Sequence, residues 1–284
     1  MTQQTLAPQQ QLDLPSLHAR LLACLGAAAP AFQFGIDAQA RIIARLYRCE
    51  LHSHFLPIVD AARPTQVYGH QGRLVGREGN NAHMKSSELQ DVARSCGVIQ
   101  QFNYVDNALH LCNYFLHAPD TYRLHLAPAP ALFADIGGFC EQLAGLLALL
   151  SVAPDRLTLR IPDSLLVSFK SAAPLLPLIA VHGFRLALGL PKRFDLLRKL
   201  RQVQAIHLVQ FDPGKRSRES NINQLMQQIG GLGAITLCSN ILDPRQNEKL
   251  VEAGASLLCG LGIAPPSAHI SPGLLPPFPW AKQA

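Results

Sequence analysis

Two kinds of hydrophobic pattern alternate along the central part of this chain. Short runs of apolar residues predict strands, and several, such as LTLRI and AIHLVQF, are almost continuously apolar. That pattern is typical of parallel strands whose two faces are both covered. The predicted strands are Glu50–Val59, Arg73–Gly76, Tyr122–Leu126, Arg156–Ile161, Phe184–Leu188, Ala205–Phe211, Ala234–Leu237 and Ser256–Leu261.

Between these runs, apolar residues recur every three or four positions, which predicts helices. Pro244 and Gly254 bracket the last of them, at positions where a helix tolerates proline and ends on glycine. A strand–helix repeat of this length predicts a (β/α)8 barrel of the TIM type. The predicted helices are Ser87–Cys96, Phe102–Leu116, Gly138–Leu150, Pro191–Arg201, Ile222–Gly230 and Arg245–Ala253.

The two ends of the chain differ from this repeat. Leu17–Ala29 and Asp37–Tyr47 show helical spacing, which predicts a pair of N-terminal helices. The first residues are Gln-rich, and the C-terminal segment is Pro-rich and contains Trp280. We therefore expect a tail with a helical extension (1–47), a barrel (48–268) and a Pro-rich C-terminal tail (269–284).

Composition agrees with one globular domain and excludes several other classes. The chain has 284 residues, of which 48% are hydrophobic and 15% charged. Its longest apolar candidate, Leu143–Val152, is shorter than the ~20 residues of a membrane helix, and no secretion signal is apparent. Seven cysteines without a CxxC pair indicate buried thiols rather than disulfides or a zinc site. We expect a cytoplasmic protein, and its scattered basic residues do not indicate nucleic-acid binding.

FLPIVD at Phe55–Asp60 is followed along the chain by LVGREGN at Leu74–Asn80. These segments resemble the opening Gln-Pro-Ile-Val-Asp and the Val-Gly-x-Glu-Ala-Leu motif of the EAL family of bacterial cyclic-di-GMP phosphodiesterases. Further similar segments follow in the family's order: RLHLAP, LTLRIPDS, FRLALGL, LVQFD, ITLCSNIL and LCGLGIAPP. The resemblance covers roughly residues 48–268 and implies an α/β fold, a modified TIM barrel of EAL type.

The resemblance also implies where the family's catalytic residues would fall. Active members hold two magnesium or manganese ions, which need several carboxylate or amide oxygens. Here only the motif glutamate is kept, as Glu78. The other family positions, mostly carboxylates, are occupied by His125, Arg160, Gly189, Leu190, Gln210, Ser239 and Cys259. The family's glutamine and arginine that contact the dinucleotide fall on Leu56 and Ala82.

These replacements predict a degenerate site. Arg160 would place a positive charge where cations should bind, a repulsion of roughly 4 kcal/mol at ~4 Å and an effective dielectric of about 20. We expect no catalysis, no metal and no cofactor, and the losses also argue against binding of cyclic-di-GMP. Glu78 is expected to pair with Arg160 across the barrel mouth.

Other residues allow alternatives. His52 and His54 alternate on one predicted strand, so they could begin a zinc site or be ordinary surface histidines. Ser239 and Cys259 could act as nucleophiles or simply pack in the core.

Three functions remain open from the sequence. The first is an inactive regulator that binds a protein, such as a transcription or motility regulator, in bacterial signalling for motility, biofilm formation or gene regulation. The second is a receptor that binds cyclic-di-GMP without hydrolysing it, and the third is an enzyme with altered chemistry. The resemblance also allows a homodimer.

Overall fold

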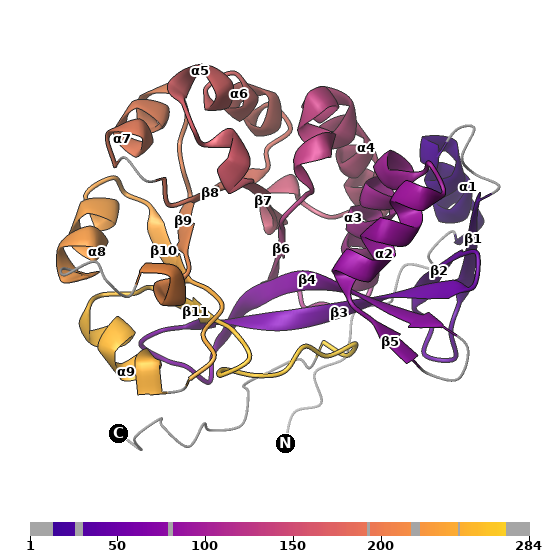
Figure 1. Ribbon diagram of the computed structural model, residues 1–284, viewed down its shortest axis with the longest axis horizontal. Helices are drawn as coiled ribbons and strands as arrows, with labels where there is room; N and C mark the ends of the chain where they lie inside the picture. The colour runs from indigo at the N-terminus through magenta and orange to yellow at the C-terminus, as the bar shows by residue number, and fades with distance from the viewer. Residues whose placement is uncertain are drawn as a thin grey trace.

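The computed structural model describes residues 14–25, 31–78, 82–191, 194–216, 222–243 and 245–270. Most of the two predicted tails, with Trp280, lies outside these ranges. The described chain forms a closed barrel whose neighbouring strands follow the order β3-β11-β10-β9-β8-β7-β6-β4, and β3 pairs with β4 to close it. Figure 1 shows helices arranged around these strands. The predicted modified TIM barrel is confirmed.

The first barrel strand runs against the others. β3 is antiparallel to both of its neighbours, β4 and β11, whereas all the remaining barrel pairs are parallel. The carboxyl ends of the parallel strands therefore meet at one end of the barrel, the mouth. The barrel strands are β3 (Cys49–Asp60), β4 (Val67–Glu78), β6 (Arg123–Leu126), β7 (Leu157–Ile161), β8 (Arg185–Gly189), β9 (Leu208–Phe211), β10 (Ile235–Cys238) and β11 (Leu257–Cys259).

The helices predicted for the barrel are present, with ends that differ by a few residues. Two short helices that follow β7, α5 (Phe169–Ala172) and α6 (Leu175–Ala180), were not predicted, because Pro174 and Pro177 interrupt the periodic pattern there. The others are α2 (Ser86–Ser95), α3 (Ile99–Phe115), α4 (Ile136–Leu149), α7 (Phe194–Val203), α8 (Ile222–Gly230) and α9 (Arg245–Glu252).

Strand alternation divides the core into an inner and an outer part. On β9, Leu208 points into the barrel, where it packs with Ile58 and Leu237, while Val209 packs against the helices outside. Both faces of such a strand are buried, which explains the nearly continuous apolar runs in the sequence.

The most apolar stretch belongs to this outer core. Pro130–Leu149 is long and apolar enough to cross a membrane, judged by length and composition alone. Its helix α4 buries Phe139, Leu143 and Leu146 against the other core residues. A core helix of a barrel passes the same test of length and hydropathy, so this stretch is explained by packing.

The N-terminal extension is a mixture of helix and strand. Helix α1 (Leu14–Leu25) agrees in part with the first predicted helix. The second predicted helix, Asp37–Tyr47, is wrong, because β1 (Phe32–Ile36) and β2 (Ile42–Leu46) form an antiparallel hairpin there. β2 pairs with β3, and β5 (Ala82–Met84) pairs with β4, so the sheet continues outside the barrel along β3 and β4 (Figure 1).

Local chemistry explains the hairpin. Asp37 closes the turn: its Oδ1 accepts hydrogen bonds from the backbone N–H groups of Gln39 (2.9 Å) and Arg41 (3.0 Å). Arg41 Nε also donates to Asp37 Oδ2 at 2.7 Å, and Ala40 takes a left-handed conformation with φ 58°. The burial of β2 alternates from Ile42 onward, which fits a strand and not a helix.

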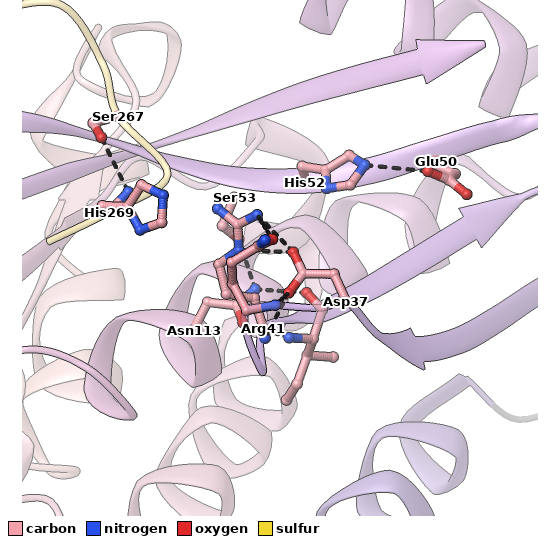
Figure 2. Close-up of polar contacts among 10 residues, drawn as sticks. Asp37, Arg41, Glu50, His52, Ser53, Asn113, Ser267 and His269 are labelled. Atoms are coloured by element: carbon pink, nitrogen blue, oxygen red, sulfur yellow. Dashed lines mark hydrogen bonds and ion pairs between the residues drawn. The ribbon is translucent and has the colours of Figure 1, made fainter. Parts of the chain in front are cut away.

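One buried amide joins this hairpin to the rest of the molecule. Asn113 of α3 accepts a hydrogen bond from the N–H of Ile42 and donates to the carbonyl of Ile42, both at 2.7 Å. It also donates to Ser53 Oγ at 3.3 Å (Figure 2). The ladder between β2 and β3 stops at Ala44, so Asn113 continues the pairing where the two strands separate.

The length of β4 decides which residues reach the mouth. The predicted strand Arg73–Gly76 covers only its outer part, whereas the part that pairs with β6 is Gly69–Gln71. A Cβ at Gly69 would overlap the backbone carbonyl of Arg123, so this close approach of β4 to β6 requires glycine. The approach brings the next inward residue, Gln71, opposite His125.

Candidate functional site

The mouth of the barrel contains a cavity of about 1080 Å³. Its floor comes from the ends of the parallel strands, and its walls come from the loops that follow them and from α7. The residues that line it include Gln71, Arg73, Arg160, Asp163, Val167, Phe169, Leu190, Asp195, Lys199, Gln210, Asp212, Ser239 and Asn240.

Uncharged polar groups form the floor. His125 of β6 and Gln210 of β9 join across the barrel through a hydrogen bond of 3.0 Å between Nε2 and Oε1. Cys259 Sγ lies 3.9 Å from Gln71 Oε1, and Arg73 donates to the same oxygen at 3.5 Å. The floor is thus a set of amides, an imidazole and a thiol that satisfy one another.

His125 is neutral at physiological pH. Burial, together with the positive charge of Arg160, lowers its pKa to about 4. The bond to the Gln210 carboxamide oxygen requires the proton on Nε2, and Nδ1 has no hydrogen-bond partner among the described residues. Burial likewise raises the pKa of Cys259 to about 12, so its sulfur is a thiol and not a nucleophilic thiolate.

Arg160, near the end of β7, is held by a residue just after that strand. Its Nη2 forms an ion pair with Asp163, three residues later, at the edge of the cavity. This pair lies over Gly189, because a Cβ there would overlap the Asp163 carboxylate and approach Arg160. The absence of a side chain at position 189 therefore leaves the space that the ion pair fills.

The predicted partner of Arg160 is wrong. Glu78 lies at the outer end of β4, opposite Cys49 and Ala82, where it is exposed and does not line the cavity. The residue of β4 that lies opposite His125 and lines the cavity is Gln71. Gly69-His70-Gln71 has the Gly-x-Glu spacing of the family motif, and this spacing was the signal in the sequence that could have found it.

The other predicted positions gather at the mouth. Leu190 and Ser239 line the cavity with Arg160 and Gln210, and the N–H of Leu190 donates to the Gln210 carbonyl at 2.9 Å. Ser239 Oγ donates to the Phe211 carbonyl at 3.2 Å, which fits a packing role.

The remaining candidates lie elsewhere. Leu56 packs inside the barrel, and Ala82 lies on β5. His52 and His54 share a half-buried face of β3, where His52 Nε2 is 3.4 Å from Glu50 Oε2 (Figure 2).

Three carboxylates lie at the mouth, although the sequence predicted none there apart from Glu78. Asp163, Asp195 and Asp212 line its outer wall. Asp163 is paired with Arg160, and Asp212 accepts from Asn240 Nδ2 at 3.0 Å and from the N–H of Gly214 at 2.9 Å. No three His, Cys, Asp or Glu side chains are arranged to hold a metal ion within the described part of the chain.

These residues do not fit a pair of magnesium or manganese ions. Such ions need several anionic oxygens close together, and the floor offers only neutral donors beside the Arg160 guanidinium. The three aspartates are dispersed over separate loops and a helix instead of converging on one point.

Comparison with known proteins identifies the fold through structure and not through sequence. No protein-family model matches the chain, and no curated protein sequence shows a significant match. Solved structures do match. The PaMucR phosphodiesterase in complex with c-di-GMP is 14% identical, with a TM-score of 0.65 over 76% of this chain and 92% of that one.

Two further solved structures agree. The FimX EAL domain from Pseudomonas aeruginosa bound to c-di-GMP is 14% identical, with a TM-score of 0.63 over 78% of this chain and 92% of that one. The Xanthomonas citri FimX EAL domain in complex with c-di-GMP is 16% identical, with a TM-score of 0.64 over 78% and 90%. The chain therefore has the fold of an EAL domain, a modified TIM barrel whose first strand runs against the others.

Proposed function

We propose that this chain is a catalytically inactive EAL-type protein that acts by protein–protein interaction in bacterial cyclic-di-GMP signalling. The observation that carries the proposal is the floor of the mouth. Gln71, His125, Gln210 and Cys259 supply no negative charge there, and the nearby Asp163 carboxylate is already paired with Arg160. Two-metal hydrolysis needs anionic ligands at this place to position the ions and activate water.

Electrostatics favours this interpretation over an altered metal enzyme. Neutral amide oxygens do not offset the charge of two divalent cations, and the Asp163 carboxylate is engaged by the Arg160 guanidinium instead of being free to bind an ion. The neutral His125 is buried and bonded to Gln210, so it is not exposed as a general base. The barrel then remains as a rigid support for contacts with another protein, for which a transcription or motility regulator is our proposal.

A second candidate is a receptor that binds cyclic-di-GMP without hydrolysing it. The cavity supports it, because Arg73, Arg160 and Lys199 could contact phosphates. The three solved structures described above contain this dinucleotide. Against it, Arg160 is already paired with Asp163, and three aspartates line the same wall.

Two measurements test the proposal. Chromatographic assays of cyclic-di-GMP and of the linear dinucleotide, with magnesium and with manganese, should show no turnover. Calorimetry should show no binding of the dinucleotide. Turnover that disappears in Gln71→Ala would contradict the inactive assignment. Micromolar binding without turnover would replace the first candidate by the second.

A further inference from the structure

Exposed apolar residues gather around the mouth of the barrel. Val167 and Phe169 follow β7 and are 77% and 41% exposed, and both line the cavity. Leu242 follows β10 and Leu261 follows β11, and they are 70% and 61% exposed. Because these strands are parallel, all four residues lie at the same end of the barrel.

The two leucines belong to loops that are joined. The N–H of Gly262 donates to the carbonyl of Ile241 at 2.8 Å, and a Cβ at Gly262 would touch the backbone of Leu242. The loops therefore hold Leu242 and Leu261 near each other on the rim. Large apolar side chains exposed around a polar hollow are a common sign of an interaction site.

The walls also carry two cations that form no ion pair among the described residues. Arg73 of β4 and Lys199 of α7 line the cavity, and neither has a carboxylate within ion-pair distance in that part of the chain. Of the aspartates that line the same cavity, Asp163 pairs with Arg160, and Asp212 accepts from Asn240 and a backbone N–H. Asp195 lies in the first turn of α7, one helical turn before Lys199, where the helix dipole favours a negative charge.

We propose that the mouth is the surface that binds the partner protein, and that it receives an extended segment with carboxylates beside large apolar side chains. This inference rests on the proposed function and names the site and the partner's chemistry. The carboxylates would meet Arg73 and Lys199, and the apolar side chains would cover Val167 and Phe169. The cavity, about 1080 Å³, is slightly larger than the roughly 300–1,000 Å³ of small-molecule pockets, so it has room for a peptide segment.

Nucleic acid is a poorer match to this surface. A phosphate backbone carries a negative charge at every residue, and it would meet Asp163, Asp195 and Asp212 as well as the cations. A peptide can place its carboxylates only where the cations are, so mixed charge on the walls selects a segment with spaced acidic residues.

A random peptide library displayed on phage, selected on the immobilised full-length chain, tests the inference. The enriched sequences should combine Asp or Glu with Leu, Ile, Phe or Trp. A selected peptide, labelled and measured by fluorescence anisotropy, should bind at least about tenfold more weakly to Val167→Ser/Phe169→Ser, a loss of roughly 1.4 kcal/mol. Arg73→Gln/Lys199→Gln should show a similar loss and a smaller dependence on salt.

A matched control uses exposed apolar residues outside the cavity. Leu178→Ser/Val181→Ser, on and next to α6, should bind the peptide as the unchanged chain does. Thermal unfolding of all variants shows whether they remain folded. Enrichment of basic peptides, absence of enrichment, or an equal loss in the control would overturn the inference. Turnover of cyclic-di-GMP would instead refute the proposed function, so the two failures are distinguishable.

Discussion

At the mouth of the barrel, neutral polar side chains stand where a metal site would need charged ones. His125 and Gln210 form one hydrogen-bonded pair, and Gln71 and Cys259 form another contact beside it. Each group satisfies a neighbour in a buried place, where an unpaired charge would be costly. A floor of this kind is stable without metal ions, whereas a cluster of carboxylates at the same place would need them.

Two buried histidines should make the stability depend on pH. Burial lowers the pKa values of His70 and His125 from 6.5 to about 4. The unfolded chain therefore binds more protons between these values, and stability present above about pH 6.5 is lost as the pH falls. We expect a loss of roughly 2 kcal/mol for each histidine between about pH 7.5 and about pH 5.

Urea unfolding at the two pH values measures this loss. In His125→Asn, which keeps a polar group for Gln210, the loss of stability on acidification should be smaller by about 2 kcal/mol. The same pH dependence in the variant and in the unchanged chain would show that His125 is not buried in its neutral form.

Two glycines of the barrel strands should respond differently to alanine. In Gly69→Ala the new methyl group meets the backbone of Arg123, which cannot move without shifting β6, so a destabilisation of about 3 kcal/mol is expected. In Gly189→Ala it meets the end of the exposed Asp163 side chain, which can turn away, so the cost should stay below about 1 kcal/mol. Denaturant unfolding compares the two, and equal costs would argue against the close approach at Gly69.

At the scale of elements, the sheet outside the barrel depends on Asn113. Asn113→Ala would leave the buried N–H and carbonyl of Ile42 without partners, which should cost about 2–3 kcal/mol. Asn107→Ala is a matched control, because Asn107 is also buried in α3 but donates only one side-chain bond, to the carbonyl of Asn103. Unfolding free energies should differ by at least about 1 kcal/mol. Amide hydrogen exchange at Ile42 should be faster in Asn113→Ala and unchanged in Asn107→Ala. Equal exchange rates at Ile42 in the two variants would contradict this role of Asn113.

The sequence predicts the barrel well and the extension poorly, for physical reasons. Helices such as α7 and α8 have a clear periodicity, and the inner strands are apolar on both faces, so local pattern decides their structure. β2 forms a strand because β3 and Asn113 pair with it, which are contacts from distant parts of the chain. Such pairing overrides the helical spacing of Asp37–Tyr47.

Local sequence patterns also predict the candidate site only in part. His125, Arg160, Gly189 and Gln210 each lie at or next to the carboxyl end of a strand that the sequence pattern predicts. Gln71 was missed because β4 continues far beyond the barrel, and its outer end contains Gly-x-Glu, at Gly76–Glu78, which matches the family motif better than Gly69-His70-Gln71 does. Only the pairing of Gln71 with His125 shows which of the two faces the cavity.

At the scale of the whole molecule, a barrel with this fold presents a hollow end that is polar on its floor and apolar on its rim. The fold keeps that end in one shape, because the strands that form it are buried on both faces and covered by helices (Figure 1). A rigid, hollow surface without catalytic carboxylates is suited to recognition, and its specificity is then set by the loops that follow the strands.

The central claim is that this mouth cannot hold divalent ions. Titration of the full-length chain with Mn²⁺, followed by electron paramagnetic resonance in the presence of cyclic-di-GMP, tests it most directly, because bound manganese loses the signal of the free ion. We predict that the free-ion signal rises from the first addition as it does in buffer. Stoichiometric loss of that signal, restored in Gln71→Ala, would contradict the account.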